Sequence, residues 1–229
     1  MMAEVSPQVW QAVWLSLKVA SVATVCALPV AVLVAYLLTR VVFWGRGLLT
    51  VVVYLPLVLP PVVTGYALLL MFGSNGYVGS LLADLGIVFA FRWTGAVLAA
   101  AIMGFPLMVR AIQQALDASD KGLEAAAASL GASKIICFLT ITLPLIAPGV
   151  LAGAILGFAK ALGEFGATIT FVASIPGQTQ TIPSAIYNFL QIPNGEPVVM
   201  WLVGISVLLS VVALAASELL GRWMRKRGV

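Results

Sequence analysis

The stretch LEAAAASLGASKIICFLTITLP, residues 123–144, is a partly polar segment between long apolar runs. Its alanines favour helix, Gly131 suits a helix end, and Ser133 could cap a second helix. Candidates for the first cap are Asp117, Ser119 and Asp120. We therefore expect segment 117–143 to form a short helix–turn–helix outside the hydrocarbon of a membrane, closed by Ile141, Leu143 and Pro144. It would either dock a partner protein or merely join two spans.

The remainder of the chain is apolar enough to lie mostly in a membrane. Of its 229 residues, 62% are hydrophobic and 9% charged, against about 25% charged in soluble domains. Lipid offers no partner for free backbone groups, so spans are expected to be helices of about 20 residues. Five runs reach that length: 13–38, 48–72, 94–116, 145–172 and 198–220. The predicted fold is all-α, a polytopic membrane protein with five transmembrane helices in one domain, residues 1–229.

Positive charge indicates the orientation of these spans. Most Lys and Arg residues lie after the first run, around the central segment or in the C-terminal tail: Arg40, Arg46, Arg110, Lys121, Lys134, Arg222, Arg225, Lys226 and Arg227. Regions rich in Lys and Arg remain in the cytoplasm. The N-terminus is therefore predicted outside and the C-terminus inside. The net charge of +4 is expected to serve contact with lipid headgroups rather than nucleic acid.

The sequence lacks the groups that several common enzyme mechanisms need. It contains no histidine and no GxxxxGK[ST] stretch, which excludes a Ser–His pair and a P-loop nucleotide site. Its eight acidic residues are scattered, without a cluster typical of a metal or paired-carboxylate site. We expect a chain that is not an enzyme and needs neither metal nor cofactor.

The second run contains LPLVLPPVVTGY, residues 55–66, which is dense in proline. Each proline removes a backbone donor and kinks or interrupts a helix. Carbonyls freed at membrane depth are tolerated against protein or a water-filled cavity. Pro60, Pro61 and the nearby Thr64 therefore indicate a pathway or gate element, or alternatively a kink that improves packing.

The fourth run contains FAKALGEFGATITF, residues 158–171, with two ionisable residues near its middle. Lys160 and Glu164 are four positions apart, so on one helix they would share a face and could pair. Two interpretations remain open. In one, the two charges only neutralise each other; in the other, Lys160 attracts an anion while Glu164 holds its side chain.

Residues 174–197 form a loop on the predicted outer side. Thr181 can cap a short helix there, with Pro183 acceptable in its first turn. The loop could receive a partner protein or close the outer mouth.

The central segment resembles the EAA motif of bacterial ABC importer permeases. Gly131 follows the alanines after three residues, and I-x-LP begins nine residues later at Ile141, as in that motif. Ala125 stands where the motif has Glu, with Glu124 one position earlier. In such permeases this segment is the coupling helix that docks on the ATP-hydrolysing subunit. The resemblance assigns ATPase coupling to Glu124, Ala125, Ala126, Ala127, Gly131, Ala132, Ile141, Leu143 and Pro144.

Longer stretches resemble the molybdate permease subunits of ABC transporters over nearly the whole chain. They are LPLVLPPVVTGY, FRWTGAVLAAAIMGFPLMVRAI, TITLPLIAPG, LGEFGATITFV and TIPSAIY. The resemblance implies the type I ABC importer permease fold, in a homodimer within the bacterial inner membrane. Two ATPase subunits would lie on the cytoplasmic side, and a periplasmic binding protein would deliver molybdate or tungstate.

The same resemblance implies an anion path along the symmetry axis of the dimer. The pathway or gate residues expected from these stretches are Pro60, Pro61, Thr64, Lys160, Gly163, Glu164, Phe165, Gly166 and Thr168. Lys160 stands where arginine is expected in this subfamily, which keeps the charge but not the bidentate geometry. The alternatives are a sulfate or thiosulfate permease, a close relative, and a secondary anion transporter working alone. The latter often shows an internal repeat, which this chain lacks.

Overall fold

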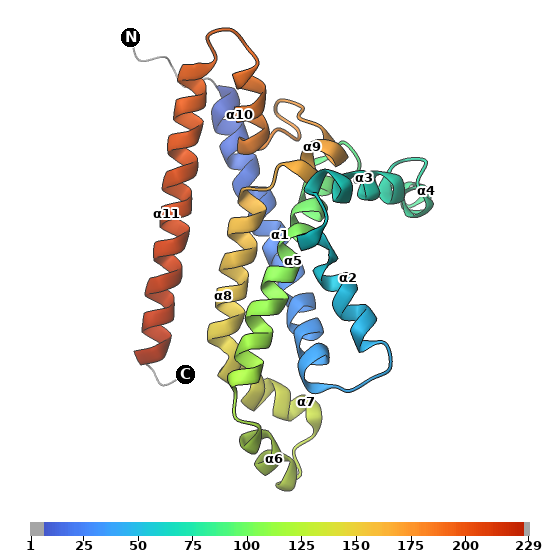
Figure 1. Ribbon diagram of the computed structural model, residues 1–229, viewed down its shortest axis with the longest axis vertical. Coiled ribbons are helices and arrows are strands. Elements are labelled where there is room, and N and C mark those ends of the chain that lie inside the picture. Colours follow the sequence, from blue (N-terminus) through green and yellow to red (C-terminus); the bar gives the residue numbers. More distant parts are fainter. Residues whose placement is uncertain (1–6, 227–229) are drawn as a thin grey trace.

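The computed structural model describes residues 7–226, and these are largely helical, without strands (Figure 1). In chain order the helices are α1 (Pro7–Arg40), α2 (Arg46–Val58), α3 (Pro61–Phe72), α4 (Tyr77–Asp84), α5 (Trp93–Ala118), α6 (Lys121–Ser129), α7 (Lys134–Cys137), the π-helical turn η1 (Phe138–Thr142), α8 (Leu143–Leu162), α9 (Gly166–Val172), α10 (Ile182–Leu190) and α11 (Glu196–Lys226).

The centre of the bundle is formed by α1, α5 and α8, whose facing sides carry many small residues. Ala23 of α1 and Ala99 of α5 are fully buried. A Cβ added at Gly104 of α5 would lie 3.1 Å from the carbonyl oxygen of Gly157 in α8. Small residues let helix backbones approach closely, and this supplies the van der Waals contact that holds membrane helices together. The alanine and glycine content of these runs thus builds the core.

Helices predicted at 13–38, 94–116 and 198–220 are present as α1, α5 and α11, each longer than expected. Among the described residues, four helices are individually long and apolar enough to cross a membrane. A fifth crossing requires α2 and α3 together, which are bent by 118°. The bend falls at Leu59 and Pro60, within the predicted proline-rich stretch. Run 48–72 is therefore not one straight helix.

The expectation of a single helix over 145–172 is wrong. A continuous helical rod begins at Lys134, passes through η1 and ends at Leu162, and α9 begins only at Gly166. Pro144 consequently does not close the central segment but lies in the first turn of α8. The π-helical turn η1 ends at Thr142, two residues before this proline.

The two ends of the bundle differ in charge. The α1–α2 connection, α6, α7 and the end of α11 lie at one end, whereas α4, α10 and the start of α1 lie at the other (Figure 1). Arg40, Arg46, Lys121 and Lys134 belong to the first group, which we name the basic end. This distribution agrees with the predicted orientation, which itself stays a prediction.

Candidate functional site

The central segment forms the predicted helix–turn–helix at the basic end. Asp120 caps α6 by accepting a hydrogen bond from the backbone nitrogen of Gly122 at 2.7 Å. Ser133 caps α7 by accepting one from the nitrogen of Ile136 at 3.3 Å. Between them Gly131 has a φ of +88°, in the left-handed region that favours glycine. Of the three cap candidates for α6, Asp120 is the N-cap, whereas Asp117 lies in α5 and Ser119 is the residue after α5.

Several large apolar side chains of this segment are exposed. Leu130 is 90% exposed and Ile135 is 73% exposed, and Leu123 and Ile136 are also exposed. Ala125 and Ala126 are exposed beside them. Apolar side chains gathered at the aqueous end of a membrane protein are typical of a protein contact. We name Leu123, Leu130, Ile135 and Ile136 the apolar face.

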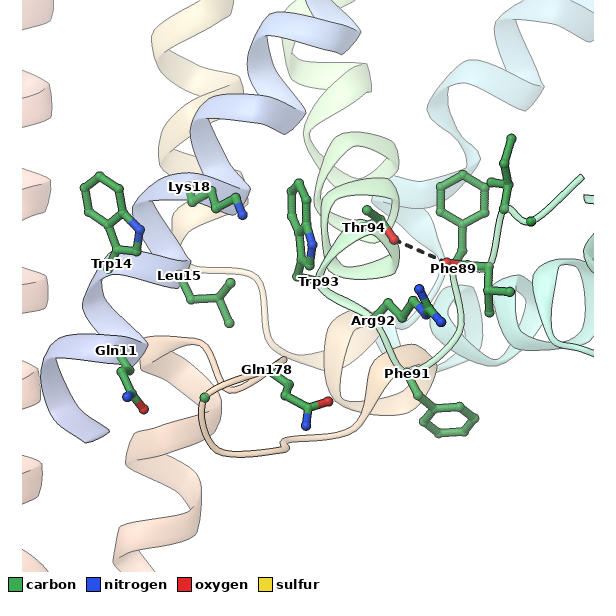
Figure 2. Close-up of a pocket in the computed structure, with 14 residues that line it drawn as sticks. Gln11, Trp14, Leu15, Lys18, Phe89, Phe91, Arg92, Trp93, Thr94 and Gln178 are labelled. Carbon is green, nitrogen blue, oxygen red and sulfur yellow. Dashed lines mark hydrogen bonds between the residues drawn. The ribbon is translucent and has the colours of Figure 1, made fainter. Parts of the chain in front are cut away.

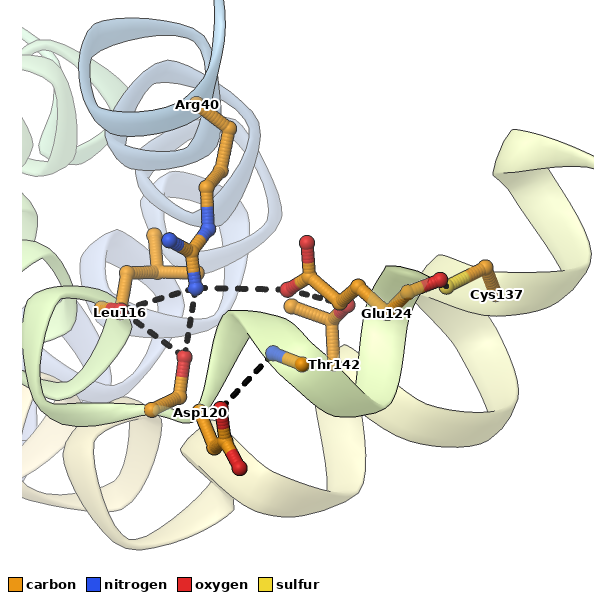
Figure 3. Close-up of polar contacts among 8 residues, drawn as sticks. Arg40, Leu116, Asp120, Glu124, Cys137 and Thr142 are labelled. Carbon is orange, nitrogen blue, oxygen red and sulfur yellow. Dashed lines mark hydrogen bonds and ion pairs between the residues drawn. The ribbon is translucent and has the colours of Figure 1, made fainter. Parts of the chain in front are cut away.

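Glu124 points inward instead, toward α1 (Figure 3). Its Oε1 lies 3.3 Å from Nη2 of Arg40, the last residue of α1, and accepts a hydrogen bond from Thr142 Oγ1 at 3.1 Å. The Arg40 side chain is 7% exposed and that of Glu124 21%. The carboxylate therefore joins α6 to α1 and to η1.

The same nitrogen of Arg40 also binds the end of α5. Nη2 donates to the carbonyl of Leu116 at 3.0 Å and to Ser119 Oγ at 2.7 Å. Arg40 Nε and Nη1 are buried without a partner among the described residues. A pocket of about 680 Å³, lined by Arg40, Glu124 and Thr142 among others, lies next to this cluster. We name Arg40, Ser119, Glu124 and Thr142 the Arg40 cluster.

The residues expected to couple to an ATPase do not all lie on one surface. Ala125, Ala126, Gly131 and Pro144 are exposed. The partly buried members are Glu124, Ala127, Ala132, Ile141 and Leu143. Ile141 belongs to η1 and Leu143 to α8, so the I-x-LP stretch lies on the rod that rises from the turn.

The predicted ion pair in the fourth run is present, but across a helix break. Lys160 Nζ lies 2.6 Å from Glu164 Oε2. Gly163 ends α8, so Glu164 lies beyond that helix and does not share a helical face with Lys160 as expected. Its other oxygen accepts a hydrogen bond from the nitrogen of Ala167 at 2.9 Å. Glu164 is 2% exposed and thus serves both as partner of Lys160 and as a cap for α9.

The helix that follows this break, α9, packs against α3 in the proline-rich stretch. A Cβ added at Gly65 of α3 would lie 2.5 Å from the carbonyl oxygen of Ala167, and one at Gly166 would lie 2.7 Å from Pro61 Cβ. Thr64 is buried here, and its hydroxyl has no hydrogen-bond partner among the described residues. The structure therefore joins the two predicted pathway stretches in one contact between α3 and α9.

The remaining pathway candidates surround this contact. Thr168 Oγ1 donates to the carbonyl of Phe165 at 2.9 Å, and the Phe165 ring lies 5.2 Å from that of Tyr187 in α10. Pro60 and Gly163 are exposed. Helix α10 begins with Thr181 in a reciprocal cap with Ser184, which confirms the cap expected there.

The sequence does not predict the Arg40 cluster. It indicates Arg40 only as a marker of orientation and Ser119 only as a cap candidate, and it indicates no role for Thr142. No local pattern could have joined these residues, because Arg40 and Glu124 belong to helices far apart in the sequence. The one available signal was a basic residue ending an apolar run, together with the acid of the central segment.

Comparison with known proteins places the chain among transport proteins. A family model described as "Binding-protein-dependent transport system inner membrane component" matches residues 27–226. The chain is 55% identical over 219 residues to the molybdenum transport system permease protein ModB of Escherichia coli (strain K12), covering 95% of this chain and 96% of that protein. It is 52% identical over 217 residues to ModB of Haemophilus influenzae, covering 94% and 95%.

More distant similarity extends to other transporters. The chain is 36% identical over 186 residues to the sulfate transport system permease protein CysT of Salmonella typhimurium, covering 81% of this chain and 67% of that protein. Among solved structures, a bacterial ABC transporter involved in alginate import matches with a TM-score of 0.72 at 19% identity, covering 96% of this chain and 80% of that one. This likeness, together with the helices described above, confirms the predicted all-α importer permease fold.

Proposed function

Because the chain belongs to the family of binding-protein-dependent transport system inner membrane components, we propose that it is the permease subunit of an ATP-driven ABC importer for molybdate. The observation that carries the proposal is the 55% identity to ModB of Escherichia coli across 95% of the chain. Identity to the sulfate permease CysT is lower, at 36%. Tungstate, a dianion of the same shape, is a second substrate of the proposed path.

In this proposal the chain supplies the path, and other chains supply energy and substrate. Two copies form a homodimer in the bacterial inner membrane, with the basic end toward the cytoplasm. Two ATPase subunits dock there, and a periplasmic binding protein delivers molybdate at the opposite end. The absence of a P-loop sequence supports placing ATP hydrolysis on a separate subunit.

We assign the docking of the ATPase to the apolar face and the exposed small residues around Gly131. Side chains that are 73–90% exposed, such as Leu130 and Ile135, have apolar area to bury against a partner. Small neighbours such as Ala125 and Ala126 allow the close approach that a helix in a groove requires.

Glu124 has a different part in this proposal: it transmits movement rather than contacting the ATPase. Its carboxylate is held by Arg40 and Thr142, so displacement of α6 pulls on α1 and η1 together. Arg40 also donates a hydrogen bond to the carbonyl oxygen of Leu116 near the end of α5, a helix of the bundle core. The Arg40 cluster is thus the proposed link between docking and the spans.

We place the gate at the contact between α3 and α9. Pro60 and Pro61 interrupt the second run, and Gly65 and Gly166 let the two short helices meet. A contact between two short elements beside a helix break needs little rearrangement to open. Lys160 Nζ and Glu164 Oε2 pair at 2.6 Å and Glu164 is buried, which supports the self-neutralising interpretation of this pair.

The test is reconstitution of the chain in proteoliposomes with its ATPase subunits and binding protein. ATP hydrolysis and molybdate uptake should rise with molybdate-loaded binding protein, and sulfate should not substitute. Stronger stimulation by sulfate would favour the sulfate permease. Uptake by this chain alone without ATP would favour a secondary transporter and contradict the proposal.

A further inference from the structure

A second pocket lies at the end of the bundle opposite the basic end (Figure 2). Its volume is about 790 Å³, and it lies between the N-terminal half of α1 and the loop that leads into α5. The polar side chains in its wall include Gln11, Lys18, Arg92 and Gln178. Among residues 7–226, the charged side chains that line it are Lys18 and Arg92, and none of the lining residues in that range is acidic. The wall is therefore positive on balance.

Both cations belong to the wall of this pocket. Lys18 extends from α1 over the ring of Trp93, with Nζ 3.7 Å from the ring centroid (Figure 2). Arg92 is the residue immediately before α5. Neither takes part in an ion pair with any residue of 7–226. Two positive groups in one wall raise the electrostatic potential of the pocket, and an anion bound in the pocket would lower the electrostatic energy.

The depth of the pocket in the membrane indicates where that anion comes from. From Lys18 to Arg40, helix α1 rises about 33 Å at about 1.5 Å per residue, close to the roughly 30 Å of hydrocarbon in a bilayer. With Arg40 at one boundary, Lys18 lies at the other, at the level of the lipid headgroups.

Exposed tryptophans support the same depth. Trp14, which also lines the pocket, is 71% exposed, and Trp10 one turn earlier is 59% exposed. Indole side chains concentrate at the boundary between hydrocarbon and water. A phosphate carried by a lipid is therefore present at this level at high local concentration.

We propose that the pocket formed by Lys18, Arg92 and Trp93 binds the phosphate of an anionic phospholipid headgroup. Lys18 and Arg92 supply the charge, and Trp93 fixes the position of the lysine by cation–π contact. Gln11 and Gln178 add amide donors at the wall. A free tetrahedral dianion shares this oxyanion chemistry, but the headgroup depth and the flanking tryptophans favour the lipid. The proposal does not depend on which substrate is transported.

The test measures lipid binding to the full chain, purified in detergent with its partner subunits. Native mass spectrometry would count bound phosphatidylglycerol and phosphatidylcholine on the wild type and on variants. A cation near an anionic membrane surface contributes about fivefold in affinity, so the variant with Lys18→Gln and Arg92→Gln should bind phosphatidylglycerol about thirtyfold more weakly. The matched control carries Arg46→Gln and Lys121→Gln, which remove the same charge at the basic end and should leave this site intact.

The outcomes separate the lipid from a free anion. Selective phosphatidylglycerol binding that is lost only in the pocket variant supports the proposal, whereas equal binding by wild type and pocket variant overturns it. Sodium molybdate added to delipidated protein forms the second arm. If molybdate binds through Lys18 and Arg92 while phosphatidylglycerol does not, the lipid assignment is wrong. Each single variant should bind phosphatidylglycerol about fivefold more weakly. The single variants therefore test the proposal even if the double variant is not produced in usable amounts.

Discussion

The ion pair between Arg40 and Glu124 provides the sharpest test of how docking would reach the spans. Glu124→Gln removes the negative charge but keeps an oxygen that can accept from Arg40 and Thr142. The two charged groups are 3.3 Å apart, and Arg40 is 7% exposed. A hydrogen bond to a charged group contributes about 1.5–3 kcal/mol and an ordinary one about 0.5–1.5 kcal/mol, so the change should weaken the attachment of α6 to α1 by about 1 kcal/mol. That corresponds to about a fivefold change in an equilibrium.

The assay compares transport with ATP hydrolysis in reconstituted vesicles. Glu124→Gln should lower the molybdate carried per ATP hydrolysed, because docking movement no longer pulls on α1. Basal ATP hydrolysis should persist, since the apolar face is untouched. Lys121→Gln, an exposed change at the start of α6, serves as the matched control and should stay close to wild type.

A double-mutant cycle with Arg40→Gln shows whether the two side chains act together. Contacting residues in one polar network give interaction energies of about 0.5–3 kcal/mol, so the double variant should be much less impaired than the sum of the single variants. Additive losses in the thermal stability and in the transport ratio would refute the linkage through this pair. The linkage would also be refuted if the Glu124→Gln variant carried as much molybdate per ATP hydrolysed as the wild type.

Three further perturbations address the turn, the break and the α3–α9 contact. Gly131→Lys should lower the free energy of unfolding by about 1 kcal/mol or more, because a φ of +88° is unfavourable for a residue with a Cβ. It should uncouple ATP hydrolysis from uptake while membrane insertion, measured by carbonate extraction, is normal. Coupled uptake in this variant would speak against docking at Gly131. Lys160→Gln should lower the free energy of unfolding by about 3 kcal/mol, because buried Glu164 loses its charged partner. It should leave the salt dependence of transport unchanged, and a flattened salt dependence would assign Lys160 to the anion path. Gly65→Ala should lower the free energy of unfolding by about 1–3 kcal/mol, because the new methyl group meets the carbonyl oxygen of Ala167. The control Gly204→Ala has open space around the new methyl group and should not be destabilised. Equal melting temperatures of the two variants would contradict the α3–α9 contact.

Much of the architecture follows from local properties of the sequence. Long apolar runs predict membrane helices wherever they occur, and the small residues within them predict close packing. The helix–turn–helix was predictable because a cap depends on one side chain and nearby backbone groups, as Asp120 and Ser133 illustrate. The interruption of the second run at Pro60 was predictable because proline also acts locally, by removing a backbone donor.

The direction of that interruption could not be predicted from the sequence. Proline frees backbone groups, but the 118° bend is fixed by α9, which packs against α3 through Gly65 and Gly166. The end of α8 at Leu162 was not predicted, because a glycine inside an apolar run, such as Gly163, is as typical of close helix packing as of a helix end. Glu164 then caps α9 instead of continuing the helix.

By itself, the sequence determined that the long apolar runs are mainly helical, that they are apolar enough for a membrane, and where the central turn lies. Each of these depends on residues within a few positions of one another. Only the tertiary structure decided that Glu124 turns inward to Arg40 and that Lys18 and Arg92 share one pocket. These groups lie on elements far apart in the chain, so their meeting depends on how α1, α5 and the central segment pack, and a charged side chain carries no local signal of the partner that packing will bring to it.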